Sequence, residues 1–186
     1  NLRQMLRAVR AAKAKALLDL HGYVDRNGDG WRERPDGQPL VLRQASMSTQ
    51  RDRLANEIWK RSMNRIGVRI EFEISTWPEL LKKSRAGGLM MWGYIWGAGS
   101  PDGGFFLGIG YGPNASESND ARFALPAYDR LYEKQARLPD GPEREAVMRE
   151  AKNLLVAYMP YKVHMHRIVN DLVQPGTKHY WRHPFM

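Results

Sequence analysis

The segment that begins at Trp96 combines residue types suited to binding a small ligand. Its sequence, Trp-Gly-Ala-Gly-Ser-Pro-Asp, places an aromatic ring, an unhindered backbone, a hydroxyl and a carboxylate close together. Glycine lets a backbone approach a ligand closely, aromatic rings supply apolar contact area, and convergent polar groups fix orientation. The residues predicted to bind a ligand here are Tyr94, Trp96, Gly97, Ala98, Gly99, Ser100 and Asp102.

The apolar run that precedes these residues has two interpretations. Residues 89–96 show no polar alternation, which predicts a strand buried on both faces. Trp92, Tyr94 and Trp96 would then share one side of that strand, either as core packing or as an aromatic wall for a ligand.

Catalytic signatures are weak. The chain has no cysteine, which excludes thiol catalysis and disulfides, and Gly97-Ala98-Gly99 lacks the third glycine and the helix start of a phosphate-binding loop. Asp102 and Glu117 could act as an acid–base pair, but nothing in the sequence fixes their separation. The sequence therefore offers no convincing catalytic pair and no cofactor site, and a binding module that is not an enzyme and a hydrolase or transferase both stay open as functions.

Two sets of residues could hold a metal ion. The first partly matches a calcium loop, which needs oxygen ligands at alternate positions, a central glycine and a final bidentate Glu. Here an Asp stands at the final position beside a proline, and no helix follows, so a polar turn is favoured. The second, His164 and His166, lies on one side of a predicted strand without an evident third ligand, which favours structural histidines. The weak calcium candidates are Asp25, Asn27, Asp29 and Asp36.

Composition indicates an ordinary globular chain. It has 186 residues, 42% of them hydrophobic and 26% charged, and no apolar run long enough to span a bilayer. The N-terminus lacks the apolar region of a signal peptide, and its helical start suggests a piece of something longer. The net charge of +9 raises nucleic acid as a partner, but the basic residues are scattered among acidic ones, so we expect no nucleic-acid binding.

Periodicity and capping signals predict an α/β fold. Residues 1–22 form a helix, 23–39 a polar turn, 40–96 a β-α-β-α-β core, 97–125 loops on the ligand side, and 126–186 helices, a last strand and a tail. The predicted strands are 40–45, 68–74, 89–96 and 161–169, and the later predicted helices are 50–66, 76–85, 126–137 and 142–158. Apolar residues at helical spacing should face the core, among them Val9, Leu17, Leu20, Leu54 and Ile58.

The order of these elements predicts a site. Right-handed crossovers make the three core strands parallel, and alternation in 68–74 places that strand at an edge, in the order 2-1-3. The carboxyl ends of the first and third strands then lie side by side. The residues after the first strand, Ser46, Ser48 and Thr49, should line the same crevice as Trp96 to Asp102.

Several motifs, in this order, resemble the extracellular solute-binding protein family 5, the dipeptide- and oligopeptide-type binding proteins of bacterial ABC importers. They cover nearly the whole chain: Ala14-Lys15-Ala16-Leu17-Leu18 with Gly22-Tyr23, Asp25 to Gly30, Ile66-Gly67-Val68, Trp96 to Asp102 with Phe106-Leu107, Asn119 with Arg122-Phe123 and Pro126 to Leu131, Arg144, and Met159-Pro160.

The resemblance implies the C-terminal lobe, residues 1–186, of a type II periplasmic-binding-protein fold with a mixed sheet. It implies a periplasmic or lipid-anchored protein, with a peptide or other small solute held between this lobe and a missing N-terminal lobe and passed to an ABC permease. It also implies that peptide-binding members pair an Asp with the amino terminus of the ligand, at the position of Gly99. The loss of that charge leaves a peptide, a sugar, a nickel chelate or an opine open as ligands.

Overall fold

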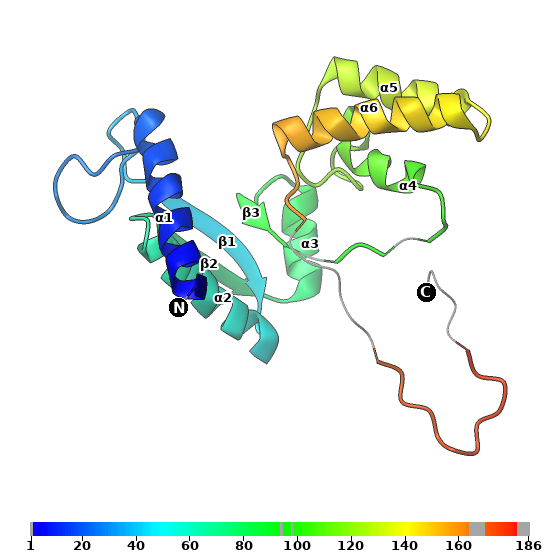
Figure 1. Cartoon of the computed structure of the whole chain (residues 1–186), viewed down its shortest axis with the longest axis horizontal. Coiled ribbons are helices and arrows are strands. Elements are labelled where there is room, and N and C mark those ends of the chain that lie inside the picture. Colours follow the sequence, from blue (N-terminus) through cyan, green and yellow to red (C-terminus); the bar gives the residue numbers. More distant parts are fainter. Residues whose placement is uncertain (1, 94, 98, 164–169, 182–186) are drawn as a thin grey trace. The chain divides into compact units, whose positions relative to one another are not determined.

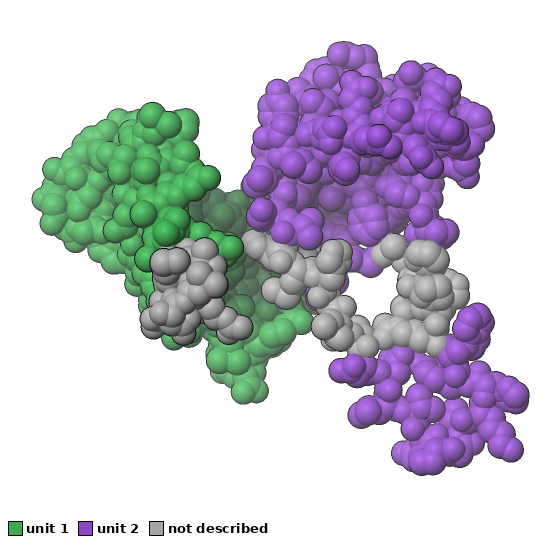
Figure 2. Space-filling view, in the orientation of Figure 1, with its two compact units in different colours: residues 1–84, 88–94 green, residues 85–87, 95–186 purple. Residues whose placement is uncertain are grey.

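The computed structural model describes residues 2–93, 95–97, 99–163 and 170–181, with side chains from residue 8 onward (Figure 1). The chain divides into two compact units (Figure 2). Unit 1 comprises residues 1–84 and 88–94, and unit 2 comprises residues 85–87 and 95–186.

Unit 1 contains the predicted β-α-β-α-β arrangement. Its strands are all parallel in the order β2-β1-β3, which confirms the predicted topology and the edge position of β2. The elements of this unit are α1 (Leu2–Leu20), β1 (Val41–Met47), α2 (Gln50–Asn64), β2 (Arg69–Ser75), α3 (Trp77–Arg85) and β3 (Met91–Trp92).

Strand β1 lies at the centre of the sheet and pairs with both other strands. It pairs with β2 along its whole length, from Val41 opposite Arg69 to Met47 opposite Ser75. Helix α2 packs against both strands. The buried apolar residues of this unit are Ala45, Val68, Ile70 and Leu80.

The third strand is much shorter than predicted. Only Met91 and Trp92 pair, with Gln44 and Ala45 of β1, and residue 94 lies outside the described residues. Burial on both faces was also wrong, because Met90 and Ile95 are 58% and 57% exposed. A strand needs a partner along its length, and Gly93 and Gly97 add little packing to hold one.

Some apolar stripes on α1 and α2 do not face the core. Both helices begin and end close to the predicted bounds, and Thr49 caps α2 as expected. However, Val9, Leu17, Leu20, Leu54 and Ile58 are between 49% and 76% exposed, and α2 buries none of its residues. Periodicity identifies an apolar face, but what covers that face is a tertiary property.

Arg32 connects the polar turn, residues 23–39, to the rest of unit 1. This side chain is buried, donates to the Ile66 carbonyl at 2.7 Å and to Asp19 Oδ1 at 2.5 Å, and also bonds the Tyr23 carbonyl. A buried guanidinium is tolerated when its donors are paired in this way. Arg32 therefore ties the turn to the ends of α1 and α2.

Unit 2 is mainly helical. Its elements are α4 (Gly104–Leu107), the 3₁₀ turns η1 (Gly108–Gly110) and η2 (Gly112–Asn114), α5 (Pro126–Arg137) and α6 (Pro142–Tyr158). The last two helices have the predicted bounds, whereas 97–125 contains α4 and two 3₁₀ turns that the prediction treated as loop. Helices α5 and α6 pack together around Leu107, Tyr128 and Ala151.

Two buried polar side chains organise the segment between α4 and α5. The Tyr128 hydroxyl donates to the Leu107 carbonyl at 2.6 Å, and burial raises its pKa. Asn119, fully buried, donates to the Tyr111 and Phe123 carbonyls at 3.0 and 2.8 Å and accepts from the Phe123 N–H at 3.1 Å. One amide thereby closes the loop from 111 to 123.

The remaining predictions concern the sheet. The expected mixed sheet is not found among the described residues, where all three strands run parallel because helical crossovers join them. The predicted last strand lies mostly outside the described residues, and its described part, 161–163, is not strand. None of the described helices combines the length and the apolar character that crossing a membrane requires.

We expect Asn119→Ala to lower the free energy of unfolding by about 3 kcal/mol, because it leaves the Phe123 carbonyl and N–H without their partner and removes one of the two bonds to the Tyr111 carbonyl. Urea denaturation measures the change. Asn153→Ala on the exposed face of α6 is the matched control and should change stability by less than about 0.5 kcal/mol. Equal stability of both variants would contradict the role given to Asn119.

Candidate ligand-binding segment

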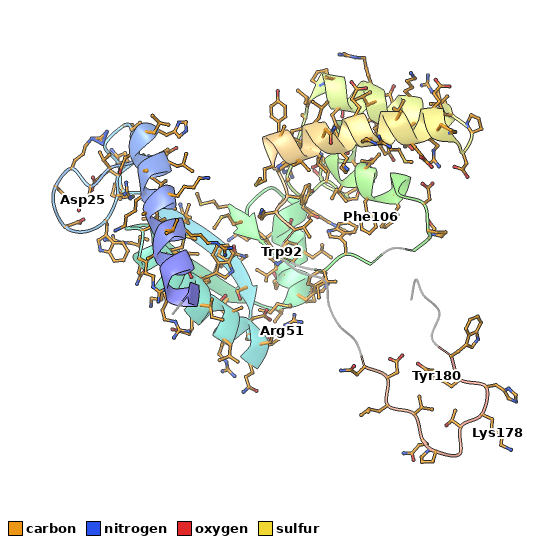
Figure 3. All side chains as sticks on the ribbon, in the orientation of Figure 1. Asp25, Arg51, Trp92, Phe106, Lys178 and Tyr180 are labelled. Carbon is orange, nitrogen blue, oxygen red and sulfur yellow. The ribbon has the colours of Figure 1, made fainter. Side chains whose placement is uncertain are left out.

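The segment 95–107 of unit 2 presents an aromatic cluster. Trp96 is half-buried and meets the edge of Phe105 at 6.4 Å between ring centroids, and Phe105 meets Phe106 at 5.3 Å. Phe105 and Phe106 lie on α4 and are 45% and 38% exposed. Figure 3 labels Phe106 on this helix. Exposed neighbouring aromatic rings provide the kind of surface on which a ligand can pack.

The small residues after Trp96 leave space. Gly97 and Gly99 are exposed, and a Cβ at either position would meet no atom of the described residues within 4 Å. Ser100 is exposed, and its hydroxyl accepts the Asp102 N–H at 3.4 Å. The predicted residues Tyr94 and Ala98 lie outside the described residues.

Asp102 is engaged within unit 2. Arg144 Nη2 donates to Asp102 Oδ1 and Oδ2 at 3.1 and 2.8 Å, and Oδ1 also accepts the Gly104 N–H at 2.8 Å. The bond from Arg144, followed by that from Gly104, lowers the pKa of the Asp102 carboxyl. Because this pKa is lowered, the ionised Asp102 carboxylate stabilises the fold at pH values above the ordinary pKa of an Asp. The stabilisation is lost as the pH falls through the lowered pKa.

The residues predicted to line the opposite side of a crevice belong to unit 1. Ser46, at the end of β1, is 8% exposed and exchanges hydrogen bonds with Asn56 of α2 at 2.9 and 3.2 Å. Ser48 and Thr49 are exposed, and the Thr49 hydroxyl accepts the Asp52 N–H at 3.1 Å. Trp96 to Asp102 belong to unit 2, so the crevice between the two sets stays a prediction.

The polar turn uses its side chains on its own backbone. Asp25 accepts from the N–H groups of Gly28 and Gly30 at 2.7 and 2.8 Å, and Figure 3 shows it on the loop after α1. Asn27 accepts from Asp29 N–H at 2.9 Å, and Asp29 accepts from Trp31 N–H at 2.8 Å. These are the bonds of a polar turn.

The predicted final calcium ligand, Asp36, does not join the others. It accepts the Gln38 N–H and pairs with Arg34 at 3.2 Å. The carboxylate that does lie with Asp25 and Asp29 is Glu33, with ligand atoms all within 4.8 Å, and Glu33 is buried and accepts the Arg26 N–H. Glu33 was not predicted from the sequence, because the spacing of a full-length calcium loop places the last ligand at Asp36.

The other residues considered for chemistry lie elsewhere in the sequence. Glu117 is exposed in the turn after η2, and His179 is exposed. His164, His166 and His183 lie outside the described residues. Arg144, Gln135 and Phe105 were not predicted as site residues. Arg144 carries a signal, since it follows a helix start and belongs to the motifs quoted above, but its partner is 42 residues away in the sequence.

Solved structures share the fold of this chain. The oligopeptide-binding protein AppA from Bacillus subtilis, in complex with a nonapeptide, matches with a TM-score of 0.70 and 18% identity over 81% of this chain and 30% of that protein. The mannohexaose-bound periplasmic oligopeptide-binding protein from Thermotoga maritima matches with a TM-score of 0.71 and 21% identity, covering 81% and 29%. The fold is that of the type II periplasmic binding proteins.

The sequence narrows this class to a family. Residues 6–118 match the model of the bacterial extracellular solute-binding proteins, family 5, and the chain belongs to that family. A curated relative, di/tripeptide-binding protein 2 of Pseudomonas aeruginosa (strain UCBPP-PA14), is 26% identical over 121 residues. That alignment covers 64% of this chain and 23% of the relative, so the chain spans about a quarter of the relative's length.

We expect the polar turn to hold without a calcium ion, because Asp25, Asn27 and Asp29 already accept backbone N–H groups. The melting temperature in millimolar calcium should then agree with that in excess EDTA to within about 1 °C, because only a bound ion stabilises by mass action. A higher value in calcium that disappears in Asp29→Ala, but persists in the matched variant Asp36→Ala, would contradict the turn interpretation.

Proposed function

We propose that this chain is the ligand-binding C-terminal lobe of a periplasmic solute-binding protein, residues 1–186, which delivers a peptide or another small solute to an ABC importer. Membership of family 5 carries the proposal. The exposed aromatic cluster on 95–107 supports it, because the family motif from Trp96 to Asp102 lies at that cluster.

The partners follow from the same membership. We infer an N-terminal lobe of the same protein, since the chain spans 23% of its curated relative and 30% of AppA. An ABC permease in the inner membrane would receive the ligand. Localisation in the periplasm, or outside the cell with a lipid anchor, fits the family description of extracellular proteins.

The ligand class stays open between peptides and other solutes. All three relatives are named for peptides, but the Thermotoga protein is bound to mannohexaose. At Gly99 this chain lacks the carboxylate that the resemblance to peptide-binding members implies at this position. A neutral solute needs no such charge, while a buried ammonium does.

A hydrolase or transferase remains the alternative function. Such chemistry needs a nucleophile and a base within hydrogen-bond reach of each other. The only carboxylate of the segment, Asp102, is bonded to Arg144. Turnover of model ester and peptide substrates would favour the enzyme, and binding without turnover would favour the solute-binding protein.

We expect Trp96→Ala to weaken ligand binding by about tenfold or more, which corresponds to about 1.4 kcal/mol, because it removes an aromatic contact surface. Isothermal titration of the full-length protein with peptide and solute libraries first identifies a ligand and then measures the change. Trp181→Ala in the exposed tail is the matched control. Unchanged affinity in Trp96→Ala would contradict the site assignment.

Replacing Gly99 by Asp tests the ligand class. A side chain fits there without a clash, so the variant should fold. We expect it to raise affinity for trialanine about tenfold over N-acetyl-trialanine, because a carboxylate can pair with a free ammonium. Titration of both peptides measures the ratio, with Gly97→Asp as the control for added charge. A wild-type protein that already prefers the free amino terminus as strongly would contradict a loss of that anchor.

A further inference from the structure

Arg144 connects three parts of unit 2. It lies in the first turns of α6, and its side chain is 13% exposed. Besides Asp102, it bonds Asp140 Oδ1 through Nη1 at 2.5 Å, Gln135 Oε1 through Nη2 at 3.1 Å, and the Gln135 carbonyl through Nε at 3.2 Å. One planar guanidinium therefore joins the candidate segment, the end of α5 and the connection between α5 and α6.

The contact with Gln135 satisfies a buried polar group, whereas Asp140 is exposed. Gln135 lies in the last turn of α5, and its carbonyl accepts the Leu138 N–H at 3.3 Å as well as the Arg144 guanidinium. Its side chain is 3% exposed, so its amide oxygen needs a donor inside the fold. The arginine thus has a structural anchor on α5 and α6 that does not depend on a ligand.

Gly104 gives an independent indication that this contact is built into the fold. It is the buried first residue of α4, directly before Phe105. A Cβ at this position would lie 2.9 Å from Arg144 Nη2, 3.0 Å from Gln135 Oε1 and 3.2 Å from Asp102 Oδ1. A Cβ here would push these side-chain ends away, so glycine fits the observed contact between α4 and the guanidinium.

We propose that Arg144 is a positioning residue. By holding Asp102 and the start of α4, it fixes the orientation of Trp96 and Phe105. The Asp102 carboxylate is then paired with Arg144 within the protein and does not pair with a ligand. This role rests on the proposed function. Both Asp102 oxygens have partners, and the guanidinium beside them would repel a cationic ligand group. Asp102 accordingly acts through Arg144 instead of pairing with the ligand.

Hydrogen exchange tests the positioning without any ligand. In the 186-residue chain, we expect Arg144→Gln to speed amide exchange of 99–107 at least about tenfold, with exchange across 145–158 unchanged. Asp102→Asn should also speed exchange of 99–107, and the double variant should add little to the effect of Arg144→Gln, because both single variants weaken the same bond between Asp102 and Arg144. Arg144→Lys should restore part of the protection, and Arg149→Gln, on the exposed face of α6, should change nothing.

Titration then separates the two roles of Asp102. With trialanine and N-acetyl-trialanine as probes on the full-length protein, Asp102→Asn should lower affinity for both by the same factor. A loss of about tenfold confined to trialanine would make Asp102 a direct counter-charge and overturn the proposal.

The two measurements distinguish the possible failures. Unchanged exchange of 99–107 in Arg144→Gln would overturn the positioning role whatever the protein binds. Faster exchange in a protein that binds no solute would support the positioning and reject the proposed function.

Discussion

The hydrogen bond from the Tyr128 hydroxyl to the Leu107 carbonyl is the interaction on which the candidate segment depends. It is fully buried and fixes the carboxyl end of α4 to α5. Around it, Leu107 and Ala151 pack against the ring, and Phe123 meets the ring edge at 5.6 Å. A short helix of four residues has little stability of its own, so this buried anchor decides where Phe105 and Phe106 are presented.

In unit 1 the main constraint is the parallel pairing of the strands. Strand β1 pairs with both neighbours, and each pairing is parallel, so two crossover helices must lie between the strands in sequence. The ladder is full on the β2 side and two residues long on the β3 side. Trp92 compensates in part through its contact with Trp77 at 5.1 Å between ring centroids. Among the described residues, β3 is thus joined to the sheet by a short ladder.

Local signals predicted what local forces determine. Helices α5 and α6 agree with prediction because proline at the first turn and apolar spacing are properties of neighbouring residues. The length of β3 did not follow, because an apolar run does not specify how far a partner strand extends. The bond from Arg144 to Asp102 was also out of reach, because two distant residues meet only once α5 and α6 are packed. Glu33 was missed for the same reason over a shorter distance in sequence, because it meets Asp25 and Asp29 only once the polar turn has folded.

The charge of the candidate segment bears most directly on what it could bind. Asp102 is the only acidic residue between Glu79 and Glu117, and Arg144 neutralises it. The described part of 95–107 therefore offers aromatic rings, open glycine backbone and the Ser100 hydroxyl. A ligand at this surface would be recognised by shape and hydrogen bonding, because a full ligand charge would lose hydration without gaining a counter-charge here. Selectivity for a charged ligand would then have to come from groups outside this segment.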